Sequence, residues 1–186
     1  MEQKTSSLLY CILVLSLITS CAQKITSLSI DKDKKLLVGK GYLLLGIDTN
    51  KDLYKITFSG PTSVVLTSQD LAKGNNYILS ELEAGEYSIR KLFNSKYSYF
   101  SFNEEENYKF TITPKEISYV GHLEIVSIGY WYPQAFLQLT NRSSEAILFM
   151  KKTFPNILSN RSINYGGPGE DDFFSFLALL KGQKND

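Results

Sequence analysis

Short apolar stretches separated by turn residues occupy the chain from Leu36 to Leu139. In several of them apolar and polar side chains alternate, as in the run from Tyr54 to Phe58. Alternation with a period of two is typical of a half-buried β-strand, and turn signals every ~8–12 residues are typical of a sandwich or barrel. Twelve tyrosines and eleven phenylalanines favour strands further. We therefore expect a mainly β fold, with an antiparallel β-sandwich of about seven to nine strands over residues 36–140.

The clearest expected strand follows Pro114. Apolar side chains would share one of its faces and polar side chains the other. A slip of one residue would exchange the two faces, so we expect the register of this strand to be firmly set. The expected inward set is Ile117, Tyr119, Gly121, Leu123 and Ile125, and the expected outward set is Ser118, His122 and Glu124.

In the last part of the chain, residues 141–186, the spacing of the apolar residues changes from that of a strand to that of a helix. Asn141 to Glu145 is a helix-start signal, and Pro155 lies where that helix should end. A second helix is expected over 171–181, because three acidic residues precede an apolar stripe at helical spacing. We expect two C-terminal α-helices that form an extension packed on the sandwich.

Residues 1–20 have the pattern of a secretory signal. Lys4 precedes an apolar run over residues 8–18, which is too short for a membrane span of ~20 residues. The run ends in Ile18-Thr19-Ser20-Cys21. This tetrapeptide resembles the bacterial lipoprotein signal, in which an aliphatic residue and two small residues precede a cysteine.

The resemblance implies cleavage before Cys21, diacylglycerol on its thiol and acylation of the new amino group. The membrane would then be one partner of the protein, since two or three acyl chains anchor stably. Residues 21–35 would be a lipidated tether, and Ala22 after the cysteine favours the periplasmic face of the outer membrane. An ordinary signal peptide with a chance cysteine is the alternative.

Composition limits the chemistry of the domain. Cys11 and Cys21 are the two cysteines, and both lie in the N-terminal segment, so none is left for a disulfide, a thiolate nucleophile or a zinc–sulfur site. The formal net charge of +1 provides no field that would attract nucleic acid. We expect no cofactor and no nucleic-acid partner.

Two segments in the middle of the chain share a pattern with a known family. They are Ala84-Gly85-Glu86-Tyr87-Ser88-Ile89 and Phe110 to Gly121. With these segments the chain resembles a family of bacterial lipoproteins with prealbumin-like β-sandwich domains of unknown function. The resemblance implies an Ig/prealbumin-like sandwich in which Gly85 and Gly121 serve turn geometry, while Tyr87 and Tyr119 fill the core. Lys115 stands where the family usually has glycine.

Two groups of residues are candidates for chemistry or binding. His122 is the sole histidine, and as a general base paired with Glu124 it would make the protein an envelope hydrolase. We favour a hydrogen-bonded or exposed strand residue. Tyr130, Trp131 and Tyr132 could stack on sugar rings or, as we favour, cover the core.

Acidic runs at 104–106 and 170–172 lack the spaced ligands of a known calcium loop and are expected to be a turn and a helix start.

Together the patterns predict a lipid-anchored envelope protein that is not an enzyme but a binding or assembly module with an envelope protein partner. A hydrolase that uses His122 and a glycan-binding module are the alternatives.

Overall fold

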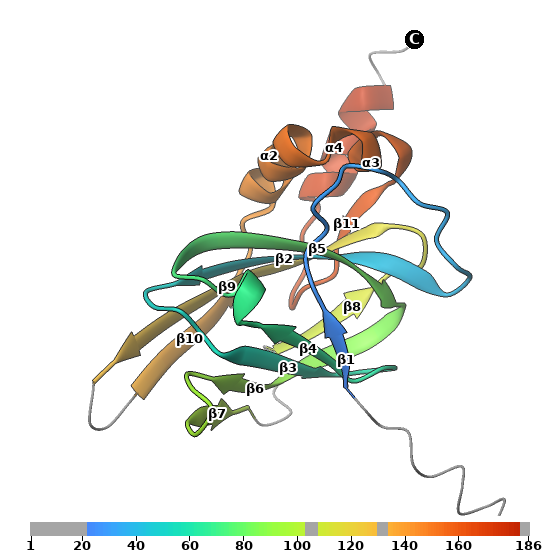
Figure 1. The fold of residues 1–186 in the computed structure, drawn as a ribbon. Helices are drawn as coiled ribbons and strands as arrows, with labels where there is room; N and C mark the ends of the chain where they lie inside the picture. The colour runs from blue at the N-terminus through green and yellow to red at the C-terminus, as the bar shows by residue number, and fades with distance from the viewer. Residues whose placement is uncertain (1–21, 103–107, 130–133, 183–186) are drawn as a thin grey trace, which may run out of the picture.

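The computed structural model describes residues 22–102, 108–129 and 134–182, and within them it is mainly β, as the sequence predicts. Two sheets pack face to face, and a layer of helices covers the outer face of one of them (Figure 1). The first sheet has the order β1-β4-β3-β6-β7, with β8 also paired to β6. Its strands are β1 (Gln23–Ile25), β3 (Lys55–Ser59), β4 (Val64–Thr67), β6 (Gly85–Phe93), β7 (Tyr99–Ser101) and β8 (Lys109–Ile112).

The second sheet has the order β10-β9-β2-β5, with β11 also paired to β9. It consists of β2 (Lys40–Thr49), β5 (Gly74–Glu83), β9 (Ile117–Ile128), β10 (Gln134–Thr140) and β11 (Ile163–Tyr165). The helices of the described residues are α2 (Ser143–Thr153), α3 (Pro155–Asn160), α4 (Phe173–Gly182) and the 3₁₀-helix η1 (Ser68–Asp70). The two expected helices correspond to α2 and α4, and α3 is an additional short one.

The prediction of a purely antiparallel sandwich is wrong, because both sheets are mixed. Strand β1 pairs with β4 in parallel, and β9 pairs in parallel with both β2 and β11. Among the described residues of 36–140 there are nine strands, β2 to β10, which agrees with the expected seven to nine, and β1 and β11 add two short strands outside that range. Local alternation predicts that a strand exists, but it contains no information about the direction of a partner far away in the sequence.

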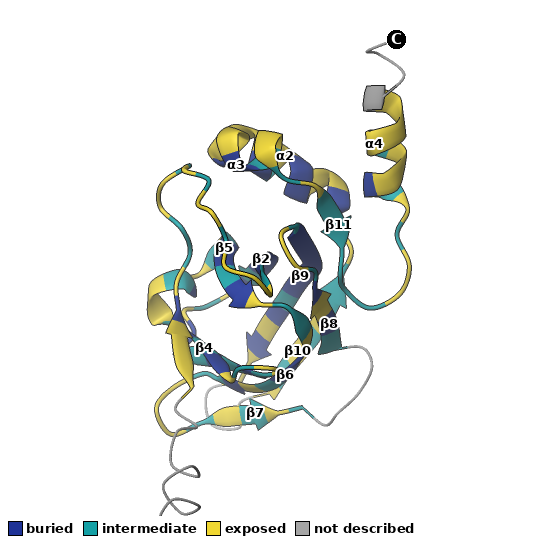
Figure 2. Ribbon diagram, turned by 90° about the vertical axis from the view of Figure 1, so that its right-hand side faces the viewer, coloured by how far each residue is buried: buried dark blue, intermediate teal, exposed yellow. Residues whose placement is uncertain are grey.

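The centre of the second sheet, formed by β2 and the first part of β9, is buried on both faces. Leu43, Leu45 and Ile47 of β2 belong to the core between the sheets, whereas Tyr42 and Leu44 belong to the core beneath the helices. A strand with two covered faces is apolar throughout, and residues 41–47 are all buried. In Figure 2 much of β9 has the dark colour of buried residues.

A bulge in β9 overturns the expected register. Leu44 pairs with Tyr119 and Gly46 with His122, so β9 has one residue more than β2 over this stretch. Gly121 lies in the extra step with φ of +112°. As a result Tyr119 packs beneath the helices, whereas Leu123 packs between the sheets. The apolar residues of β9 therefore do not share one face, as the alternation had predicted.

Residues 22–35, expected to be a tether, are part of the fold. The Ser27 amide donates to Asp70 Oδ1, and the Leu28 amide donates to the carbonyl of Leu79. The Asp31 carboxylate accepts the amide hydrogens of Asn156 and Ile157 at 2.8 and 3.0 Å, which caps the start of α3. Asp33 lies 2.6 Å from Arg161 Nε. The segment thus connects the edge of the first sheet with the helical layer.

Lys115 is the non-glycine residue with a left-handed backbone among the described residues, with φ of 66°. Its amide donates to the carbonyl of Lys40, and its carbonyl accepts from Arg161. These bonds hold the turn between β8 and β9 in a conformation that costs an ordinary side chain ~1–2 kcal/mol.

We expect Lys115→Gly to stabilise the fold by about 0.5–1 kcal/mol, because relief of the left-handed strain exceeds the entropy that glycine adds to the unfolded chain. Urea unfolding measures the change. Lys115→Ala retains Cβ and is the matched control, expected to leave the free energy of unfolding within about 0.5 kcal/mol of wild type. Equal stabilisation by both substitutions would contradict the assignment of strain to this turn.

Candidate functional site

His122 lies directly after the bulge of β9, and the bulge turns its ring toward the helical layer. The ring is completely buried, and the edge of Tyr77 faces it with ring centroids 5.5 Å apart. Tyr77 in turn stacks on Phe149 of α2 at 4.5 Å. The expectation of an exposed or hydrogen-bonded strand residue is wrong, because neither ring nitrogen has a hydrogen-bond partner among the described residues.

Gly46 of β2 makes the space for this ring. A Cβ atom at position 46 would lie 2.1 Å from His122 Nδ1, closer than two such atoms can approach. Gly46 is the residue that pairs with His122 across the two strands. Gly46 and His122 therefore pack directly against each other in the centre of the sheet.

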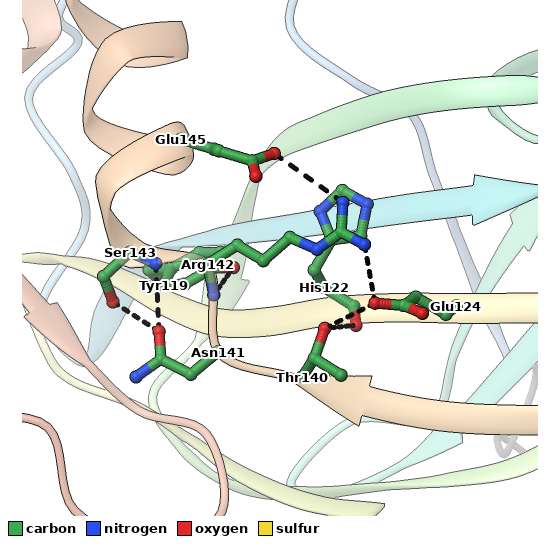
Figure 3. A network of polar contacts seen from close by, with 8 residues as sticks. All are labelled: Tyr119, His122, Glu124, Thr140, Asn141, Arg142, Ser143 and Glu145. Atoms are coloured by element: carbon green, nitrogen blue, oxygen red, sulfur yellow. Dashed lines mark hydrogen bonds and ion pairs between the residues drawn. The ribbon is translucent and has the colours of Figure 1, made fainter.

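A charged network covers the histidine on its outer side (Figure 3). Arg142, the residue before α2, donates from Nη2 to Glu124 Oε1 at 2.6 Å, and its Nη1 lies 3.7 Å from Glu145 Oε2. Thr140 Oγ1 also donates to Glu124, at 2.9 Å. These bonds from Thr140 and Arg142 hold the pKa of Glu124 below its usual value.

Burial lowers the pKa of His122 from its ordinary value of 6.5, and the positive charge of Arg142 lowers it further. Glu145, Asp48 and Glu124 act in the opposite direction but do not outweigh these two causes. At pH 7 the His122 ring is therefore uncharged, and it is shielded from solvent. A general base must come within hydrogen-bond reach of its substrate, so this arrangement argues against the hydrolase alternative.

Several predicted site residues lie outside the described residues: Cys21, the three aromatics Tyr130, Trp131 and Tyr132, and the acidic run at 104–106. The acidic run at 170–172 is described and has a structural role. Asp171 Oδ1 accepts the amide hydrogen of Phe173, and Asp171 Oδ2 accepts the Ser143 hydroxyl at the start of α2. Burial would raise the pKa of Asp171, but hydrogen bonds from Ser143 and Asn141 lower it overall. This carboxylate therefore joins the starts of α2 and α4.

A groove that the sequence did not predict lies between the helices and β11. Its volume is about 620 Å³. Most of its wall is aliphatic or aromatic, and in the lining set the charged side chains are Lys151 and Arg161. The lining residues are Ile147 and Lys151 of α2, Leu158 of α3, Arg161, Ser162 and Ile163 around the start of β11, and Phe174, Leu177, Ala178 and Leu180 of α4.

Helix α4 forms one wall of this groove and leaves much of its apolar surface uncovered (Figure 2). Phe176 is 57% exposed and Leu179 68%, while Phe174 is buried. No helix in the described ranges is long and apolar enough to cross a membrane. The signal for the groove is present in the sequence: residues 173–180 are apolar nearly all round, which exceeds the single stripe that a surface helix needs.

No protein-family model matches the chain, and the comparison with curated proteins finds no match.

We expect Gly46→Ala to destabilise the protein by about 1–3 kcal/mol, because the new methyl group overlaps the buried imidazole. In a His122→Ala background the same substitution should cost less than about 1 kcal/mol, since the overlap is gone. A double-mutant cycle by urea unfolding measures this coupling. Additive effects of the two substitutions would contradict the packing of Gly46 against His122.

The stability of the protein should depend on pH through His122. The unfolded chain binds a proton near pH 6.5, whereas the native ring with its lowered pKa stays neutral. The unfolded state therefore binds more protons as the pH falls below this value, so stability decreases toward low pH by up to about 1.4 kcal/mol per pH unit. His122→Gln should flatten the profile between about pH 5 and 6.5, measured by urea unfolding, where carboxylates contribute little. An unchanged slope in the variant would refute this origin.

Proposed function

We propose that the protein is a lipid-anchored component of the bacterial cell envelope, and that its domain is a non-catalytic binding or assembly module. The observation that carries the binding role is the apolar groove at the helical layer, with α4 only partly covered. A groove of this size is within the range of small-molecule sites, ~300–1,000 Å³. The envelope location is supported by the sequence pattern that ends in Cys21.

The state of the sole histidine supports binding rather than catalysis. His122 is buried beneath the salt bridge between Arg142 and Glu124, and Asp171 is engaged in joining two helices. Groups that could serve acid–base chemistry are thus part of the structural framework. No observation on the described residues favours the hydrolase or the glycan-binding alternative over this proposal.

The position of the N-terminus gives the module an orientation. Ala22 leads directly into β1, at the end of the molecule remote from the helices (Figure 1). Because residues 23–35 are held on the domain, a lipid on Cys21 would keep the first sheet close to the bilayer. The groove would then face away from the attached leaflet, which on the periplasmic face of the outer membrane means toward the periplasm.

The likeness to prealbumin-like lipoproteins belongs to the same proposal. It is supported by the packing of two sheets, by the burial of Tyr87 and Tyr119, and by the left-handed backbone of Lys115 at the place of the family's glycine. The parallel pairing of β2 with β9 is a feature of this chain that the likeness does not imply.

We expect Cys21→Ser to abolish the incorporation of labelled fatty acid and to move the protein from the membrane fraction to the soluble fraction. The reason is that the thiol to be acylated is removed, and with it the stable anchor of two or three acyl chains. Metabolic labelling and fractionation measure both effects. Cys11→Ser is the matched control and should change neither, because Cys11 would be removed with the signal. Continued labelling and membrane association of the Cys21→Ser protein would refute the anchor.

A further inference from the structure

We propose that the groove between α2, α3, β11 and α4 binds a fatty acid, a single acyl chain whose anionic carboxylate lies at Lys151. The inference rests on the proposed binding function and assigns a ligand class to its site. The ligand is an amphiphile from outside this chain.

The wall of the groove is suited to a hydrocarbon chain. Ile147 and Leu158 of the helical layer and Leu177 and Leu180 of α4 all line it. Apolar surface of this kind gains ~25 cal/mol for each Å² that a ligand removes from water. The groove has a volume of about 620 Å³, and an extended acyl chain is a thin apolar ligand that can lie along such a wall.

The charged side chains that line the groove indicate which head group its ligand carries. Arg161 is already engaged: its Nε contacts Asp33 at 2.6 Å, and its Nη atoms donate to the backbone carbonyls of Lys115 and Lys34. Lys151 forms no ion pair with any described residue. None of the lining residues carries a carboxylate. The side chain available for pairing is therefore a cation, and an anionic head group complements it.

The lipid expected on Cys21 is not a suitable occupant of the groove. Strand β1, which follows Ala22, begins at the end of the molecule opposite the helices, so a lipid on Cys21 would project away from the groove (Figure 1).

Photo-crosslinking tests the inference on the full chain in its own membranes. The probe is palmitic acid with a mid-chain diazirine and a terminal alkyne. Light-dependent labelling separates groove binding from acylation of Cys21, which needs no light. We expect labelling of the wild type that maps to α2 or α4, with competition by palmitate and none by the hexadecyltrimethylammonium cation.

Two matched pairs of variants locate the site. Leu180→Asp places a charge in the groove, whereas Leu179→Asp places it beside the groove on the same exposed helical turn. Lys151→Glu reverses the charge that holds the head group, and Lys152→Glu changes the neighbouring lysine, which does not line the groove. We expect Leu180→Asp and Lys151→Glu to reduce labelling about tenfold and the controls to stay within about twofold of wild type. All four side chains are partly or fully exposed, so the fold should persist.

Equal labelling within both pairs, or equal competition by the anionic and the cationic amphiphile, would overturn the inference. Absence of labelling would overturn it as well, while loss of membrane association in Cys21→Ser would still support the anchor. Conversely, groove labelling that persists when Cys21→Ser fails to release the protein would support the ligand assignment and refute the anchor.

Discussion

The parallel pairing of β2 with β9 in the centre of the second sheet is the constraint on which the other features depend. It creates a sheet with two covered faces, so that Leu43 and Leu45 can serve one core while Tyr42 and Leu44 serve the other. Burial on both faces explains how a domain whose two cysteines lie outside it can be held together by packing. The helices are thus one of three layers, and their place follows from the apolar outer face of this sheet.

The extra residue of β9 couples the two cores to the candidate site. Because the strand register shifts at Gly121, His122 points toward the helices and meets Gly46, whose lack of a side chain leaves room for its ring. On the outer side of the ring, Arg142 donates a hydrogen bond to Glu124. Burial of a charged imidazole would cost far more than burial of the neutral ring, and the lowered pKa of His122 keeps the ring neutral at physiological pH. The side chain that the sequence offers as a candidate general base is, in the structure, a buried ring packed against Gly46 and Tyr77.

The two ends of the chain have opposite roles in the proposed function. The segment after Cys21 is pinned to the domain by Asp31 and Asp33, which leaves little length for a flexible spacer. The other end carries α4, whose leucines form one wall of the groove and remain partly exposed. With the anchor at one end of the molecule and the groove at the other, a membrane-bound protein would expose the groove to the compartment that borders the attached leaflet.

The sequence by itself determined the period of each segment. Alternation around Ile56 and Phe58 predicted a strand, and the stripe from Phe173 to Leu180 predicted a helix, because these patterns depend on neighbours only two to four residues away. It did not determine the direction of strand pairing, the face of His122 or the groove beside Lys151. Each of these depends on segments far apart in the sequence: β2 against β9 for the pairing, a one-residue bulge for the histidine, and α2 against α4 for the groove. Local periodicity indicates whether a side chain will be buried. Only tertiary packing decides which residues bury it and which apolar surface stays exposed to a ligand.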